Sequence, residues 1–109
     1  MTATFEEFGR LELAIGVVTD VEDFPEARKP AWKLTIDFGP RGTRRSSAQI
    51  PHYPREELLG RQVVCVLGFE SKRIAGFRSE VLVLGATSEE HGVVLLRPDR
   101  AVEPGASVA

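Results

Sequence analysis

Strict two-residue alternation in residues 32–38 (WKLTIDF) is the feature that most constrains the fold of this chain. Successive side chains of a strand point to opposite faces, so the pattern predicts a strand with one buried and one exposed face. Residues 39–42 (GPRG) predict a turn, and residues 43–50 (TRRSSAQI) predict a polar partner strand. The expected hairpin places Trp32, Leu34, Ile36 and Phe38 on the core side, and Lys33, Thr35 and Asp37 on the other.

Short apolar segments along the rest of the chain predict further strands. Residues 11–24 alternate and then change phase after Gly16, which indicates a bulge or bend. Residues 51–60 predict one helix of about two turns, with Pro54 at its start and Gly60 at its end. Apolar strands are expected at residues 63–67, 81–84 and 93–96, and loops or turns at residues 24–31, 86–92 and 97–109.

The order of these elements predicts the architecture. It contains no strand–helix–strand alternation, which argues against a doubly wound sheet. The pattern is typical of an all-β, five-stranded barrel, and one short helix between the third and fourth strands indicates the oligonucleotide/oligosaccharide-binding (OB) fold. At 109 residues the chain is expected to form a single domain over residues 1–109.

Composition argues against several classes of protein. No apolar run approaches the roughly 18 residues that cross a bilayer, and the N-terminal segment is acidic, so we expect a cytoplasmic protein without membrane insertion. The single cysteine, Cys65, lies in VVCVL and is expected in the core. His52 and His91 are distant and show no metal-ligand spacing. With no phosphate loop and no serine beside a positioned base, we predict no catalytic residue, metal or cofactor.

The charges are unevenly distributed along the chain. Residues 1–27 contain one base and seven acids, whereas residues 28–78 contain eleven bases and four acids. A near-neutral total is compatible with nucleic-acid binding if the cations gather on one face. The alternative is that these charges are simply solvated surface.

Two segments could form an anion-binding site. In residues 43–50, alternation places Arg44 and Ser46 on one face and Arg45, Ser47 and Gln49 on the other. Guanidinium groups bind phosphate in a bidentate manner, and hydroxyl and amide groups bind sugar or base edges. Residues 68–78 are expected to form a glycine-containing basic hinge that adds Lys72, Arg73 and Arg78. Phe69 and Phe77 are the candidates for base stacking, with core packing as the alternative for each.

Four ordered segments resemble the bacterial CsaA proteins, which belong to the tRNA-binding-domain superfamily of OB folds. The segments are residues 24–39 (FPEARKPAWKLTIDFG), 46–50 (SSAQI), 72–85 (KRIAGFRSEVLVLG) and 93–99 (VVLLRPD). Related domains are C-terminal appendages of methionyl-tRNA synthetases and the N-terminal part of some phenylalanyl-tRNA synthetase β subunits. The chain departs from the family at Gly68, Glu70 and Ser71, where members usually have Asn and prolines, and at Ala14, where many have Arg.

The resemblance implies a homodimer in which the extensions at residues 4–13 and 98–108 wrap the partner. It also implies tRNA binding without catalysis, and family members are described as export-related chaperones that bind unfolded or presecretory polypeptides. The positions that match ligand contacts in the family are Lys33, Ser46, Ser47, Gln49, Lys72, Arg73, Gly76 and Ser79.

Two functional hypotheses therefore stay open. The first is a dimeric, non-catalytic module that binds tRNA or another structured RNA through its backbone and 2′-hydroxyl groups. The second is a molecular chaperone whose groove holds unfolded polypeptides on apolar surface around Phe69, Ile74 and Phe77. An enzyme is a distant third.

Overall fold

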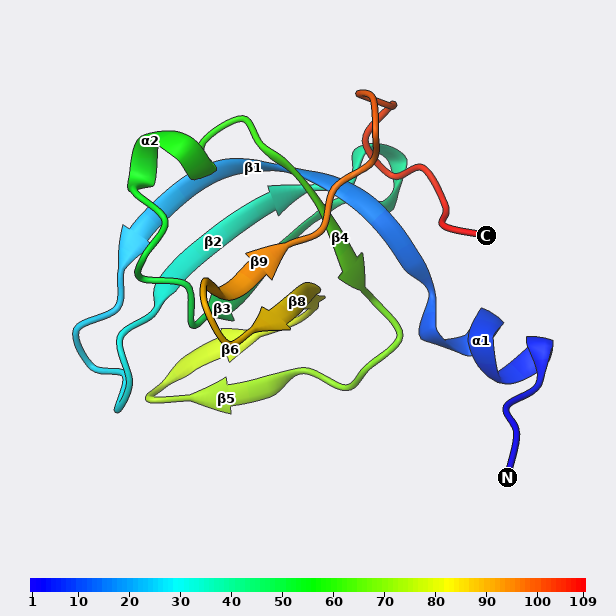
Figure 1. Ribbon diagram of the computed structural model, residues 1–109, viewed down its shortest axis with the longest axis horizontal. Coiled ribbons are helices and arrows are strands. Elements are labelled where there is room, and N and C mark those ends of the chain that lie inside the picture. Colours follow the sequence, from blue (N-terminus) through cyan, green and yellow to red (C-terminus); the bar gives the residue numbers. More distant parts are fainter.

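The computed structural model describes residues 1–109 (Figure 1). Its helical elements are α1 (Phe5–Leu11), the 3₁₀ turn η1 (Gly39–Arg41) and α2 (Arg55–Leu58). Its strands are β1 (Leu13–Asp23), β2 (Trp32–Asp37), β3 (Thr43–Ala48), β4 (Gln62–Val66), β5 (Lys72–Ile74), β6 (Phe77–Ser79), β7 (Leu82–Val83), β8 (Gly85–Ser88) and β9 (Gly92–Leu95).

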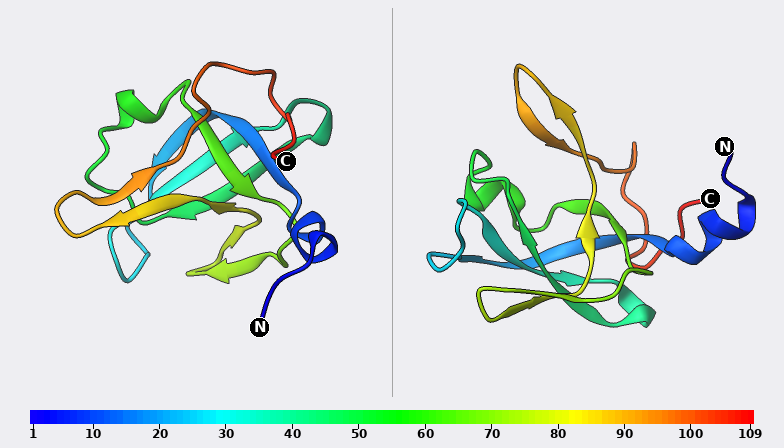
Figure 2. Two further views of the ribbon diagram at one scale, coloured as in Figure 1. Left: turned by 45° about the vertical axis from the view of Figure 1, so that its right-hand side comes forward. Right: turned by 90° about the horizontal axis from the view of Figure 1, so that it is seen from below.

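Five strands form one antiparallel sheet in the order β3-β2-β1-β4-β7, which curls into a nearly closed barrel (Figures 1 and 2). The alternation in β2 is confirmed: Leu34, Ile36 and Phe38 are fully buried, because every second side chain of the strand points into the barrel. Since α2 lies between β3 and β4, the all-β OB-fold prediction is also confirmed, although α2 is one turn rather than two.

β1 is the longest strand and curves along the whole barrel (Figure 1). Its pairing with β2 shifts between Val18 and Asp20, so the irregularity that was expected at Gly16 lies at Thr19. An extra residue in one strand increases its local twist and lets a sheet curl. Gly16 has a different role, because a Cβ at this position would overlap the side chains of Ile36 and Phe38.

The barrel closes where β3 meets residues 79–81, and we call this line of contact the seam. Arg45 and Glu80 exchange two bonds across it: the Arg45 amide donates to Glu80 Oε1 at 3.0 Å, and the Glu80 amide donates to the Arg45 carbonyl at 2.8 Å. Ser46 Oγ donates to the Val81 carbonyl at 2.8 Å, and the Ser47 amide donates to Ser79 Oγ at 3.1 Å. Three of these four bonds use a side chain, so side chains provide most of the pairing that closes the barrel.

Two segments that were expected to be irregular are β-hairpins. The basic hinge at residues 68–78 contains β5 and β6, which pair across a turn at Ala75 and Gly76. Both turn residues have positive φ, 48° and 82°, as a two-residue type I′ turn requires. Likewise, the polar loop expected at residues 86–92 contains the end of β8, the turn that follows it and the start of β9, with which β8 pairs. Strands this short give too little alternation to be recognised.

Both ends of the chain are attached to the barrel. The start of the segment expected as a strand at residues 11–24 is instead the end of α1, whose N-terminus has a capping box between Thr4 and Glu7. The Gly68 amide donates to the Leu11 carbonyl at 2.8 Å, and a Cβ at Gly68 would overlap the carbonyls at the end of α1. Residues 105–108 bond to the start of β1, for example from the Val108 amide to the Leu13 carbonyl at 3.0 Å. None of the helices has the length and apolarity that crossing a bilayer requires.

Candidate nucleic-acid interface

A cleft of about 670 Å³ lies where the β1–β2 loop, the end of β3 and β5 meet. Its position follows from the fold, because β2 and β3 pair directly and the β5–β6 hairpin docks along the seam. Figures 1 and 2 show the β1–β2 loop and the turn of this hairpin at the same end of the barrel. We call this space the cationic cleft; its lining residues are Ala27, Arg28, Lys29, Ala31, Ser47, Gln49, Lys72, Arg73 and Ile74.

Four cations and no carboxylate line this cleft. Arg28, Lys29, Lys72 and Arg73 are all exposed, and none of them forms an ion pair with an acidic side chain. Unpaired cations that surround a concave surface raise the local concentration of anions and leave every guanidinium and ammonium donor available. The cleft is therefore suited to an anionic ligand with several charged groups.

A layer of aromatic rings and cations lies beside the cleft. Phe24 and Phe77 pack edge to face with ring centroids 5.4 Å apart. Lys33 Nζ is 5.2 Å from the centroid of Phe24, and the Arg45 guanidinium carbon is 4.7 Å from that of Phe77. Phe77 is buried under these cations, so it supports them and does not stack on a ligand. Arg45 also forms a 2.8 Å ion pair with Glu22, which fixes its guanidinium in this layer.

Ser47 connects the cationic cleft with two neighbouring clefts, because its side chain lines all three. One neighbour, of about 240 Å³, adds Phe69, which is half exposed, together with Glu70 and Leu82. The other, of about 250 Å³, is mostly apolar. The continuous surface thus changes from cationic at Arg28 to apolar at Leu82.

The structure brings some of the predicted site residues together and separates others. Ser47, Gln49, Lys72 and Arg73 line the cationic cleft, and Lys33 and Arg45 form the layer beside it.

The remaining predicted residues do not line the cleft. Ser46 is buried and bonded to the Val81 carbonyl, so it is inaccessible to a ligand and supports the seam. Ser79 also serves the seam, as the acceptor for the Ser47 amide. Arg44 lies on the opposite face of β3 from Arg45 and contacts the Arg41 carbonyl. Gly76 forms the hairpin turn, and Arg78 lies opposite Arg73 in the hairpin register.

Arg28 and Lys29 belong to the cleft but were absent from the residues predicted to bind a ligand. Residues 24–31 were read as a loop, and no periodicity indicates which way a loop residue faces. The available signal was the pair of adjacent bases between Pro25 and Pro30, at the point where the chain changes from acidic to basic.

Residues with nucleophilic or basic side chains elsewhere are in structural positions. Cys65 is confirmed as a core residue, and burial raises the pKa of its thiol to about 12; the thiol is therefore protonated and unreactive at neutral pH. His52 bonds through Nε2 to the Val93 carbonyl at 2.8 Å and so attaches β9 to the segment before α2.

The chain is similar to known proteins over nearly its whole length. Residues 13–107 match the family model described as "Putative tRNA binding domain". A methionine–tRNA ligase from Pyrococcus furiosus is 37% identical over 105 residues, which cover 96% of this chain but only 14% of that enzyme.

Two solved structures match over their whole length. The CsaA chaperone protein of Picrophilus torridus has a TM-score of 0.94 and 45% identity, and the match covers 99% of this chain and 100% of that one. Chaperone CsaA of Bacillus anthracis has a TM-score of 0.92 and 50% identity, with both chains fully covered. The chain therefore belongs to the tRNA-binding-domain family of OB folds, as a CsaA-like member.

Proposed function

We propose that this protein is a non-catalytic binding module that holds tRNA, or another structured RNA, in the cationic cleft. The observation that carries the proposal is the set of four unpaired cations, Arg28, Lys29, Lys72 and Arg73, around one cleft without a carboxylate. The match to a tRNA-binding family supports it. Since the chain spans 14% of the methionine–tRNA ligase, nothing of that enzyme's aminoacylation is carried over.

In this cleft, charged side chains would contact the phosphates of the RNA and neutral polar side chains would contact its sugars. Lys72 and Arg73 on β5, and Arg28 and Lys29 on the loop opposite, would contact successive phosphates of the backbone. Ser47 and Gln49 lie between them and offer a hydroxyl and an amide to 2′-hydroxyl groups, which distinguish RNA from DNA. Phe69 is half exposed and lines the neighbouring cleft with Ser47 and Lys72, where it could stack on an unpaired base.

The test is a salt-dependent binding titration of the purified protein against tRNA. Affinity should fall steeply with salt, because each neutralised phosphate releases counterions. Lys72→Ala combined with Arg73→Ala should weaken binding by at least about tenfold and reduce the salt slope by about two. Arg10→Gln is a control, since it removes an exposed cation of α1 that lies outside the cleft. No tRNA binding at low salt, or a double variant that binds like the wild type, contradicts the proposal.

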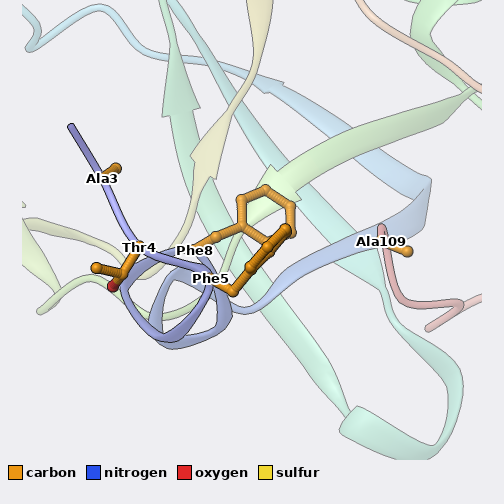
Figure 3. A pocket seen from close by; sticks show the side chains of 5 residues that line it. All are labelled: Ala3, Thr4, Phe5, Phe8 and Ala109. Carbon is orange, nitrogen blue, oxygen red and sulfur yellow. The ribbon is translucent and has the colours of Figure 1, made fainter.

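We also propose that the protein is a homodimer, assembled through the terminal segments. Phe5 is almost fully exposed, and with Phe8 it lines a second, apolar cleft of about 670 Å³ between α1 and Ala109. Figure 3 shows both rings projecting from α1. An exposed apolar surface of this kind marks a protein contact, and the occupant that we propose is the same region of a second copy.

Polypeptide binding is the second candidate function, and the apolar end of the surface favours it. Phe69 and Leu82 are about half exposed, and both line the cleft of about 240 Å³ that Ser47 and Lys72 also line. Both CsaA relatives are named as chaperones. In this role the protein would work in the cytoplasm and hold unfolded or presecretory chains during export. If several-fold excess protein fails to slow aggregation of a chemically denatured substrate, this candidate is ruled out.

A further inference from the structure

A small basic pocket of about 260 Å³ lies away from the cationic cleft, between the start of β4 and the segment that follows β9. In Figures 1 and 2 this segment and the β5–β6 hairpin lie on opposite sides of the barrel. Its lining residues, mostly charged or polar, are Gly60, Arg61, Gln62, Arg97, Pro98, Asp99, Arg100 and Ala101.

Three arginines and one carboxylate line this pocket. Arg97 forms no ion pair, and the single acid, Asp99, is 3.7 Å from Arg100. Both partners of that pair are almost fully exposed, so water screens their interaction and it does not satisfy the Arg100 guanidinium. Three guanidinium groups and one carboxylate therefore leave the pocket with an excess of positive charge.

Arg61 is the one cation of the three that packs against an aromatic ring. Its guanidinium carbon lies 5.2 Å from the centroid of the Tyr53 ring, which holds the planar group by a cation–π contact. Its Nε is buried and has no hydrogen-bond partner. Buried polar atoms without a partner are uncommon in folded proteins, because each one has lost its bonds to water. Arg61 thus lines a basic pocket with hydrogen-bonding capacity that no acceptor of the chain uses.

The walls of the pocket are fixed by backbone and amide bonds. The Val18 amide donates to the Arg61 carbonyl at 3.0 Å, which attaches Arg61 to β1. Gln62 exchanges two bonds with Val102: its Nε2 donates to the Val102 carbonyl at 2.6 Å, and its Oε1 accepts from the Val102 amide at 3.1 Å. The backbone of the segment that carries Arg97 and Arg100 is thereby held against β4, close to Arg61.

We propose that this pocket is a second anion site, which binds a phosphate or pyrophosphate group through Arg61, Arg97 and Arg100. Guanidinium groups suit this ligand because their planar N–H pairs match two phosphate oxygens. The same chemistry could come from an RNA backbone or from a free phosphorylated small molecule. The site is independent of the cationic cleft, and either site can exist without the other.

The experiment uses pyrophosphate and the full chain, observed by amide chemical shifts. Titration should perturb the amides of residues 60–62 and 97–101 in a saturable way. Arg97→Gln combined with Arg100→Gln should abolish this set of shifts or weaken the binding by at least about tenfold. Arg28→Gln combined with Lys29→Gln is the matched control, since it removes two cations from the cationic cleft and should leave these shifts unchanged.

Salt titrations with tRNA then identify the source of the phosphate. A smaller salt slope in the Arg97→Gln, Arg100→Gln variant assigns the pocket to the RNA backbone, whereas an unchanged slope assigns it to a free phosphorylated ligand. The proposal is overturned if pyrophosphate perturbs only the amides around the cationic cleft. It is equally overturned if pyrophosphate leaves the amides of residues 60–62 and 97–101 unperturbed; a change of oligomeric state in the double variant would then assign the arginines to a subunit contact.

Discussion

Ser46 and Ser47 are adjacent in β3, yet Ser46 stabilises the barrel and Ser47 lines the cationic cleft. Ser46 points into the barrel and bonds to the Val81 carbonyl, while Ser47 points outward and lines three clefts. The sequence alternation predicted that they lie on opposite faces, but it could not say which face was covered. That depends on residues 79–81, which approach β3 only in the folded barrel.

The two serines should therefore respond differently to the same substitution. Ser46→Ala should lower the free energy of unfolding by about 1–3 kcal/mol, because the Val81 carbonyl loses its buried donor. Ser47→Ala should change it by less than about 0.5 kcal/mol, as is usual for surface positions, yet weaken tRNA binding. Urea unfolding measures the first effect and titration the second. Equal destabilisation by both changes would contradict the assignment.

Cys65 should give the stability of the protein a specific alkaline dependence. The folded thiol has a pKa of about 12, above its ordinary value of 9.0. The unfolded state therefore releases this proton first as the pH rises, and the free energy of unfolding falls progressively between about pH 9 and pH 12. Cys65→Val should remove this part of the pH dependence. The check is to compare the two proteins by urea unfolding across that range.

At the scale of elements, the β5–β6 turn does not have the most stable sequence for its conformation. Ala75 adopts a left-handed conformation that an alanine tolerates poorly, whereas Asn accepts it and Asn-Gly is the preferred type I′ pair. Ala75→Asn should stabilise the protein by about 0.5 kcal/mol, and Gly76→Ala should destabilise it by about 1 kcal/mol. A Cβ at Gly76 meets no other atom, so the second effect comes from the backbone alone. Thermal unfolding of both variants tests the two signs.

The elements that could be predicted from the sequence are those with one buried face and one exposed face. β2 has an inward and an outward face, and its alternation was readable. α1 buries no residue and was not predicted; the sequence signal that could have indicated it is the Thr4–Glu7 capping box. β5 and β6 have three residues each, fewer than a full alternation needs. In the same way, Lys72 and Arg73 stood out as a basic pair beside a strand, but the approach of Arg28 and Lys29 depends on tertiary structure.

The β1–β2 loop should contribute as much to tRNA binding as β5 does. Arg28→Ala combined with Lys29→Ala removes two of the four cations of the cleft, so we expect at least about a tenfold weaker complex and a reduced salt slope. Arg78→Ala removes a cation from the same hairpin as Lys72 but outside the cleft, and its effect should stay below about threefold. Filter binding at several salt concentrations compares the variants. If Arg78→Ala weakens binding as much as the loop variant does, the RNA is not bound mainly in the cationic cleft.

At the scale of the whole molecule, the cleft proposed to bind RNA and the surface proposed to form the dimer are separate. The cationic cleft lies at one end of the barrel, and the apolar cleft of Phe5 and Phe8 lies at the chain termini. In Figure 2, α1 extends beyond the barrel on the side away from the β1–β2 loop. A dimer formed through α1 would leave both cationic clefts open.

Replacing both aromatic residues of α1 should dissociate this dimer. Phe5→Ser combined with Phe8→Ser removes the apolar lining without touching the core, since neither residue is buried. Light scattering should report twice the 12.0 kDa chain mass for the wild type and a single chain for the variant. Phe69→Ser is the control, because it removes an exposed phenylalanine elsewhere. A wild-type protein that is monomeric at micromolar concentration refutes the dimer.

The seam has a further consequence for dynamics. β2 pairs with β1 and with β3 along its whole length, but the seam depends on a few bonds around Arg45, Ser47 and Glu80. Weakly paired segments are where a protein opens locally, and their amide hydrogens exchange with solvent fastest. Ser47 lies on one side of the seam and the β5–β6 hairpin lies on the other, so a ligand in the cleft would contact both sides. A bound RNA would then hold the seam closed, and the Ser47 and Glu80 amide hydrogens would exchange more slowly in the complex than in the free protein.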